Sequence, residues 1–147
     1  AGRKGFSVIS IAKAMMNTEL GFSRKVLSAF EQYGVSVEHL PTGIDTMCVV
    51  VSGAALAPVR DKVLAQIVAT TSPDTITVHD YMSIIATVGR GMVNNCGTAA
   101  RLFSAMSKAG INVRMIDQGS SELSIIVGVD DADYENTIKA IYNAFVR

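Results

Sequence analysis

The sequence predicts an α+β protein made of two tandem βαββαβ units, of which the second ends before its fourth strand. Three observations predict this fold class. The chain aligns with itself at a shift of 76 residues without a gap, and strand-like and helix-like segments alternate in the same order in both halves. The composition is 49% hydrophobic but only 6% aromatic, which is typical of aliphatic sheet cores packed under helices.

The internal repeat aligns residues 6–51 with residues 82–127, and ten of the 46 aligned pairs are identical. About 3 identities are expected by chance for a composition this apolar. Three of the identical pairs are glycines at the ends of predicted elements: Gly21/Gly97, Gly34/Gly110 and Gly43/Gly119. The repeat therefore indicates a duplicated domain.

The first unit begins with a buried strand over residues 6–11, followed by a helix over residues 23–33 whose apolar side chains recur at helical spacing. Gly34 ends this helix, because glycine adopts the left-handed C-terminal cap without steric strain. Two strands follow over residues 35–38 and 47–51, joined by a turn.

A second helix of this unit is expected from Pro58, which suits a first helical turn. Five residues form its apolar face: Val59, Val63, Leu64, Ile67 and Val68. Residues 75–79 alternate as a fourth strand, so the first unit is complete.

The second unit repeats this order with a strand over residues 82–88, a helix over 98–109 and two strands over 111–116 and 123–129. A last helix carries Tyr134, Ile138, Ile141 and Phe145 on one face. Asp130 and Asp133 are expected to cap its first turn. No fourth strand follows, so this unit either stays open, borrows a strand, or is completed by sequence outside this chain.

These elements define two ferredoxin-like domains, over residues 5–80 and 81–147. Only His79, Asp80 and Tyr81 connect them, so we expect the two domains to pack side by side. Each would cover one sheet face with two helices, which leaves apolar faces and edges that favour a homodimer.

Composition and charge exclude several classes of function. Thirteen basic and thirteen acidic residues give no net charge. The basic residues form no stripe and the central predicted strands contain no aromatic residue, so the sequence does not favour nucleic-acid binding. The apolar runs are too short for a membrane span, and the first residues lack a signal-peptide core. Cys48 and Cys96 have no metal-ligand or disulfide spacing, so we expect two buried thiols and a cytoplasmic protein.

Motifs of catalysis are absent from the sequence. It contains no phosphate-binding GxxxxGK[ST], no GxSxG and no HExxH, and Gly89-Arg90-Gly91 does not continue into a GxGxxG fingerprint. We therefore expect no catalytic residue, no metal site and no cofactor within these 147 residues.

One candidate site occurs in both units. A strand leads into a long loop, residues 12–20 or 88–96, and then into a glycine at a helix start, Gly21 or Gly97. The free amides of a first helical turn suit a carboxylate, and glycine allows it to approach the backbone closely. Alternatively, each glycine only lets the loop turn into its helix.

Three segments carry a resemblance to a known family: MMNTELGFSRKVL at residues 15–27, VEHLPTGID at 37–45 and IDQGSSE at 116–122. The chain resembles, over residues 5–147, the regulatory region of the aspartokinases, which is built from two ACT domains. The resemblance implies feedback inhibition by lysine, threonine or both, acting on a separate kinase domain that uses ATP and Mg to phosphorylate the aspartate carboxylate. That kinase domain is missing here, so we expect an inactive fragment, either excised or made as a separate small subunit.

The resemblance also implies where an effector would bind, between the ACT domains of a dimer. The implied effector-binding residues are Met16, Glu19, Gly21, Phe22, Ser23, Ser36, Val37, Glu38 and Thr42. A possible second site comprises Met92, Asn95, Gly97, Thr98, Ala99, Asn112, Val113 and Gln118. Glu38 or Glu19 would face a side-chain ammonium, whereas the residue aligned with Glu38 is Arg114, so lysine should prefer the first site.

Two other functions remain open. The chain could be a structural dimerisation module without a ligand, or an ACT sensor of a different enzyme.

Overall fold

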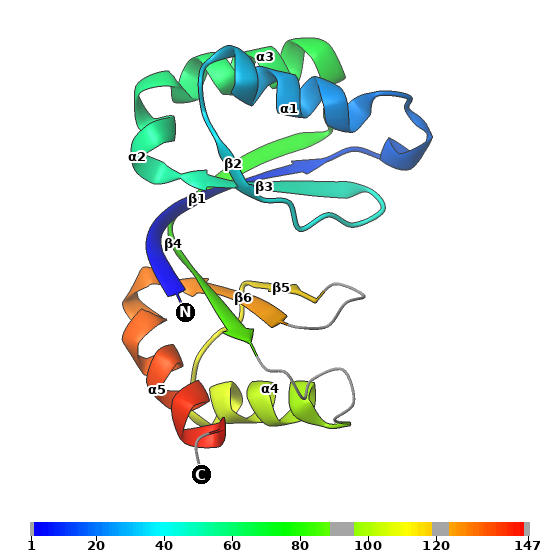
Figure 1. Ribbon diagram of the computed structural model, residues 1–147. Coiled ribbons are helices and arrows are strands. Elements are labelled where there is room, and N and C mark those ends of the chain that lie inside the picture. Colours follow the sequence, from blue (N-terminus) through cyan, green and yellow to red (C-terminus); the bar gives the residue numbers. More distant parts are fainter. Residues whose placement is uncertain (1, 89–95, 119–123, 146–147) are drawn as a thin grey trace. The chain divides into compact units, whose positions relative to one another are not determined.

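The computed structural model describes residues 2–88, 96–118 and 124–145. The chain divides into two compact units (Figure 1). The first unit is Gly5–Tyr81, and the second unit combines Ala1–Lys4 with Met82–Arg147.

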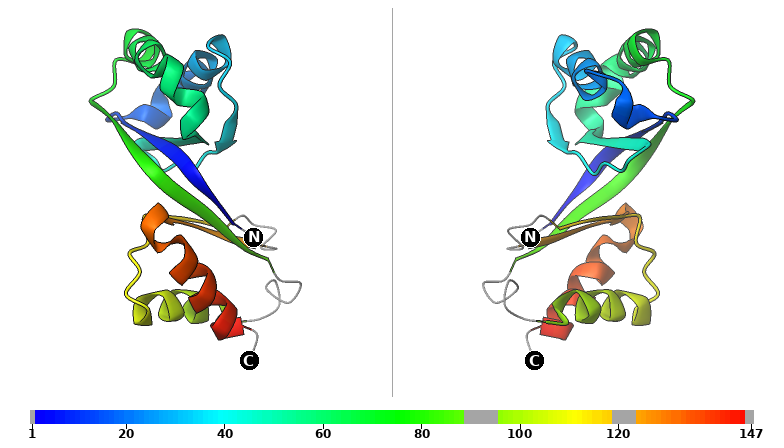
Figure 2. Two further views of the ribbon diagram at one scale, coloured as in Figure 1. Left: turned by 90° about the vertical axis from the view of Figure 1, so that its left-hand side faces the viewer. Right: turned by 90° about the vertical axis from the view of Figure 1, so that its right-hand side faces the viewer.

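The first unit has the predicted α+β topology. Its elements are β1 (Gly2–Ala12), η1 (Met16–Thr18), α1 (Phe22–Gln32), β2 (Val37–His39), β3 (Thr46–Ser52), α2 (Gly53–Leu56), η2 (Ala57–Val59), α3 (Arg60–Thr71) and the first half of β4 (Thr75–Val88). The strand order is β2-β3-β1-β4, and β3 runs antiparallel to both β1 and β2. Helices α1 and α3 lie on one face of this sheet (Figures 1 and 2).

The core of the first unit lies between that sheet face and the two helices. Its largest fully buried side chains include Phe30 on α1, Ile9 and Ile11 on β1, and Ile67 on α3. Val68 was expected on the apolar face of α3, but 46% of it is exposed. The buried residues of α3 are Val63, Ile67 and Thr71, and this four-residue spacing turns Val68 away from the sheet.

The helix predicted from Pro58 is divided into three short elements, α2, η2 and α3, with Pro58 in the first turn of η2. Ser52 Oγ accepts a hydrogen bond from the Ala55 amide at 3.3 Å and caps α2. The break follows because Pro58 cannot donate an amide to a continuous helix.

The second unit contains the second half of β4, then α4 (Thr98–Lys108), β5 (Met115–Asp117), β6 (Ser124–Asp130), η3 (Asp131–Asp133) and α5 (Tyr134–Phe145). Its strand order is β4-β6-β5, and both neighbouring pairs are antiparallel. The core includes Leu102 and Met106 on α4, Val127 on β6 and Ile141 on α5.

Both β2 and β5 are shorter than predicted, for the same reason. The Val35 amide donates to the Phe30 carbonyl at 2.9 Å, and the Ile111 amide donates to the Met106 carbonyl at 3.0 Å. These bonds close the C-terminal ends of α1 and α4 in the Schellman pattern that Gly34 and Gly110 permit. The residue after each glycine therefore bonds to the end of a helix and not to a neighbouring strand, so β2 and β5 begin later than predicted.

The second unit borrows its missing strand. Residues 2–4, at the start of β1, cluster with the second unit, and β1 is the sheet neighbour of β4. A Cβ atom at Gly2 would lie 2.9 Å from Tyr134 Cε1 and 3.1 Å from Ile85 Cγ1, so a side chain at this position would have to displace Tyr134 or Ile85. The Lys4 ammonium lies 5.8 Å from the centre of the Tyr134 ring.

Two smaller expectations are wrong. Asp130 does not cap the last helix with its side chain, because its Oδ1 accepts from Arg114 Nη1 at 2.8 Å. Cys48 is partly buried as a small apolar residue, but Cys96 is exposed where the chain enters α4.

Over the described ranges, no helix combines the length and apolarity needed to cross a membrane. The same ranges contain no cluster of three or more His, Cys, Asp or Glu that could hold a metal ion.

Candidate functional site

The loop between β1 and α1 lines a cavity of about 310 Å³ in the first unit. Ten residues line it: Met16, Asn17, Glu19, Gly21, Phe22, Ser23, Arg24, Thr42, Gly43 and Ile44. They come from η1, from the first turn of α1 and from the turn before β3. The volume is at the small end of the range for ligand sites, which suits a molecule of amino-acid size.

Six of the nine residues predicted for the first site line this cavity: Met16, Glu19, Gly21, Phe22, Ser23 and Thr42. The other three, Ser36, Val37 and Glu38, lie at or in β2 and are not among its lining residues. Val37 packs against the core, while Ser36 and Glu38 are exposed. Within one chain the structure therefore does not bring β2 to the cavity.

The start of α1 has the geometry expected of a carboxylate site. Gly21 adopts a φ of +76° immediately before the helix, and within this described turn no side chain caps the helix amides. A Cβ at Gly21 would lie 3.7 Å from Arg24 Nη2, so the guanidinium group lies beside the first turn. The positive end of the helix and Arg24 together favour an anion here.

Glu19, one of the two carboxylates expected to face a side-chain ammonium, is already paired within the first unit. Its Oε1 accepts from Lys13 Nζ at 2.6 Å, and its Oε2 lies 3.7 Å from Lys25 Nζ. The hydrogen bond from Lys13, with the positive charges of Lys13 and Lys25, holds the pKa of Glu19 below its ordinary value of 4.5. Glu19 therefore stays ionised and is already paired with two ammonium groups.

Sequence reasoning missed Asn17, Arg24, Gly43 and Ile44 as lining residues. Arg24 could have been predicted, because it follows the candidate residue Gly21 by three positions and residues three apart on a helix share a face. Gly43 and Ile44 had none, since their approach to α1 depends on how the turn before β3 folds.

The second predicted site is only partly described. Met92 and Asn95 lie outside the described residues. Gly97 repeats the geometry of Gly21 with a φ of +88° before α4, and Thr98 begins that helix. Asn112 and Gln118 are exposed, whereas Ala99 and Val113 pack against the core. Arg114, which aligns with Glu38, is paired with Asp130.

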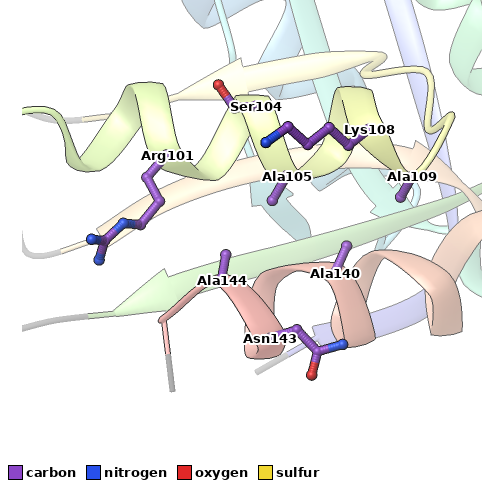
Figure 3. A pocket seen from close by; sticks show the side chains of 8 residues that line it. All are labelled: Arg101, Ser104, Ala105, Lys108, Ala109, Ala140, Asn143 and Ala144. Carbon is purple, nitrogen blue, oxygen red and sulfur yellow. The ribbon is translucent and has the colours of Figure 1, made fainter. Parts of the chain in front are cut away.

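A larger cavity of about 590 Å³ lies between α4 and α5 in the second unit (Figure 3). Figure 3 shows Ala105 and Ala109 facing Ala140 and Ala144, with Arg101 and Lys108 also projecting from α4. Gly97 and Thr98 do not line it, so this cavity is distinct from the predicted second site. The small alanine side chains leave the space between the helices unfilled.

Comparison with known proteins supports the assignment of the fold. Residues 85–145 match the model of the ACT domain family. The chain is 38% identical to aspartokinase 3 of Bacillus subtilis over 99% of its own length and 32% of that protein. It is 49% identical to the aspartate kinase of Clostridium acetobutylicum in a crystal structure with a TM-score of 0.94, covering 99% of this chain and 34% of that one.

Two more distant structures show the same fold. The regulatory subunit of aspartate kinase from Thermus thermophilus is 21% identical with a TM-score of 0.81, and the match covers 99% of this chain and 95% of that subunit. Aspartokinase III of E. coli, solved with lysine and aspartate, is 18% identical with a TM-score of 0.75 over 99% of this chain and 32% of that one.

The chain spans about a third of the length of the Bacillus subtilis aspartokinase. The match to that protein covers 99% of this chain. Both units have the fold of aspartate kinase regulatory subunits, and the family model recognises the second of them. The chain therefore corresponds to the tandem ACT-domain regulatory region of the aspartokinases.

Proposed function

We propose that the first unit binds the amino acid that regulates an aspartate kinase, with lysine as the preferred effector and threonine as a second or joint one. The observation that carries this proposal is the cavity of about 310 Å³ at the start of α1, which combines Gly21, Arg24 and apolar walls. An α-amino acid always offers a carboxylate, and this is the group that the first turn of α1 and Arg24 suit.

The remaining groups of the effector need partners outside this cavity. Glu19 is already paired with Lys13 and Lys25, so it is a poor partner for a side-chain ammonium. Glu38 is exposed on β2, which leaves it available to an effector held by a second copy of the chain. A homodimer in which β2 of one copy borders the cavity of the other would bring Glu38 and the Val37 carbonyl to the effector.

In this proposal the complete protein is an aspartate kinase of the cytoplasm. Its kinase domain would transfer phosphate from ATP, with Mg, to the aspartate side chain, and effector binding to the ACT domains would inhibit that step. The lysine complex of E. coli aspartokinase III has the same fold, which supports an amino-acid effector. This region contributes binding and subunit pairing, not phosphoryl transfer.

A structural dimerisation module is the second candidate. Leu20 is 93% exposed and Ile44 is 73% exposed, and both lie at the β1–α1 loop or the turn that faces it. Exposed apolar side chains of this size favour burial against another subunit whether or not a ligand is present.

Calorimetric titration with lysine and threonine separates the two candidates. The proposal predicts saturable binding of lysine, and a Glu38→Ala variant that binds lysine roughly tenfold more weakly with a smaller effect on threonine. Glu31→Ala removes another exposed carboxylate, on α1, and should leave both affinities unchanged. A folded protein that binds neither amino acid would favour the structural module.

A further inference from the structure

We infer that Lys13 is a positioning residue of the effector cavity, because its ammonium group holds the cavity-lining loop, residues 15–21, on the C-terminal end of α3. The inference rests on the proposed function, since it concerns how that cavity is kept ready for an effector. Lys13 itself is not among the residues that line the cavity.

The Lys13 ammonium contacts three groups from different segments. Its Nζ donates to Glu19 Oε1 at 2.6 Å and to the Thr71 carbonyl at 2.5 Å, and it lies 5.9 Å from the centre of the Phe22 ring. Glu19 and Phe22 both line the cavity, whereas Thr71 is the last residue of α3. Only 23% of the Lys13 side chain is exposed. One side chain therefore joins the loop to a helix of the core.

The position of Thr71 explains why a cation suits this place. The last carbonyls of a helix have no partner within the helix and carry the negative end of its dipole. An ammonium group satisfies the Thr71 carbonyl and the Glu19 carboxylate together, and both bonds are charge-assisted. The pKa of Glu19 lies below its ordinary value chiefly because of the Lys13 hydrogen bond, so the carboxylate remains charged near neutral pH.

The backbone holds only the base of the loop. The Asp74 amide donates to the Ala12 carbonyl at 2.8 Å, and the Ala14 amide donates to Asp74 Oδ2 at 2.8 Å. Beyond Ala14, the hydrogen bonds that η1 makes in the described structure are local: the Thr18 amide donates to the Met15 carbonyl, and the Glu19 amide donates to the Met16 carbonyl. Local bonds shape a turn but do not fix its place against α3. Met16 anchors the loop in the apolar core, and the Lys13 bridge supplies the polar long-range attachment to α3.

The bridge also sets the charge that an effector meets. Glu19 is neutralised by Lys13 and Lys25, so the cavity does not recruit an ammonium group through Glu19. Arg24 and the start of α1 then dominate the field, and they favour the carboxylate end of the effector. Lys13 therefore contributes both the placement of the loop and the orientation of its ligand.

The test compares Lys13→Met with Lys13→Arg and with Lys25→Met. Lys25 approaches Glu19 only at 3.7 Å and makes no described contact with Thr71, so Lys25→Met is the matched loss of one charge. Calorimetry should show lysine binding about fivefold weaker or more for Lys13→Met, and within about twofold of wild type for the other two variants. Equal losses for Lys13→Met and Lys25→Met, or no loss for either, would overturn the inference.

Two measurements without any effector keep the inference testable by itself. Amide hydrogen exchange at residues 15–21 should be faster in Lys13→Met but not in Lys25→Met. A carbon NMR titration should show the pKa of Glu19 rising toward 4.5 when Lys13 is removed, more than when Lys25 is removed. If wild type binds neither lysine nor threonine, the proposed function fails, and unchanged exchange in Lys13→Met would then refute the positioning role as well.

Discussion

Gly21 combines two roles at the residue scale that mutation can separate. Its φ of +76° is a left-handed conformation that a residue with a Cβ adopts only with strain, and Gly34 at the other end of α1 has a φ of +72°. A Cβ at Gly34 meets nothing within 4 Å, while one at Gly21 points toward Arg24 beside the cavity. The two glycines therefore share the backbone constraint but not the site.

We predict that Gly21→Ala and Gly34→Ala each lower the free energy of unfolding by about 1 kcal/mol, because both place alanine in the left-handed region. Only Gly21→Ala should also weaken effector binding, since its methyl group enters the carboxylate site. Urea denaturation and calorimetry on both variants provide the comparison. Equal binding by the two variants would show that an effector does not approach Gly21.

Asp80 makes stability depend on pH. Its Oδ1 accepts from the buried Ser7 hydroxyl at 2.6 Å, and its Oδ2 accepts from Arg60 Nη1 at 2.9 Å. The Ser7 hydrogen bond first, and then the Arg60 contact, hold the pKa of Asp80 below its ordinary value of 3.8. A carboxyl whose pKa is depressed by folding stabilises the protein above its unfolded pKa, and that contribution is lost as pH falls through the folded pKa.

Ser7→Ala should therefore lower the free energy of unfolding by about 0.5–1 kcal/mol at neutral pH, a value reduced by the exposure of Asp80. The difference in the free energy of unfolding between Ser7→Ala and wild type should become smaller as pH falls below 3.8. Asp80 is then protonated first in the unfolded chain and, at lower pH, in the folded wild type and variant as well. Ser10→Ala, on the same strand but without a carboxylate partner among the described contacts, is the control. A Ser7→Ala deficit that stays constant with pH would contradict this account.

At the scale of elements, the periodic patterns predicted the helices and strands well because one face of each is buried. The helix over 23–33 corresponds to α1 with a shift of one residue, and the strand over residues 6–11 lies within β1, which begins four residues earlier than predicted. Sequence periodicity predicted the elements wrongly where tertiary contacts decide where a strand or helix begins and ends. Residues 75–79 and 82–88 form one strand, β4, that passes through Tyr81 with a φ of +57°. No local pattern predicts that one strand continues through such a residue.

The candidate site shows the same division. Residues 16–23 could be found because a loop, a glycine and a helix start follow one another in sequence. The partners of Glu19 could not, because Lys13 and Lys25 reach it only once the loop has folded. Val37 and Glu38 lie on β2 and Ser36 precedes it, and none of the three lines the cavity in one chain, so the sequence pattern alone could not place them.

Helix α3 offers a matched test of the packing assignment. Val63 is fully buried, whereas Val68 is 46% exposed. Val63→Ala should lower the free energy of unfolding by about 2 kcal/mol, because it leaves a cavity in the core, and Val68→Ala by less than about 0.5 kcal/mol. Similar losses in thermal or chemical denaturation would mean that α3 is rotated relative to the sheet.

At the scale of the whole molecule, we expect self-association through the exposed apolar side chains of the first unit. Light scattering of the wild type should give about twice the chain mass of 15.6 kDa at tens of micromolar. Leu20 is 93% exposed in the single chain, and self-association would bury it. Leu20→Glu should therefore shift the mass toward that of one chain, because the dimer would have to bury a charge. Tyr142→Glu, at an exposed position in the second unit, should not.

The central claim is that an amino acid binds at the start of α1, and NMR titration of the labelled protein with lysine and with threonine tests it most directly. The account predicts saturable shifts of backbone amides at residues 16–24 and 42–44, with those of Gly21 and Ser23 among the largest because they are nearest the carboxylate. It also predicts a shift at Glu38 for lysine. Shifts confined to the second unit, or no saturable shift with either amino acid, would contradict it.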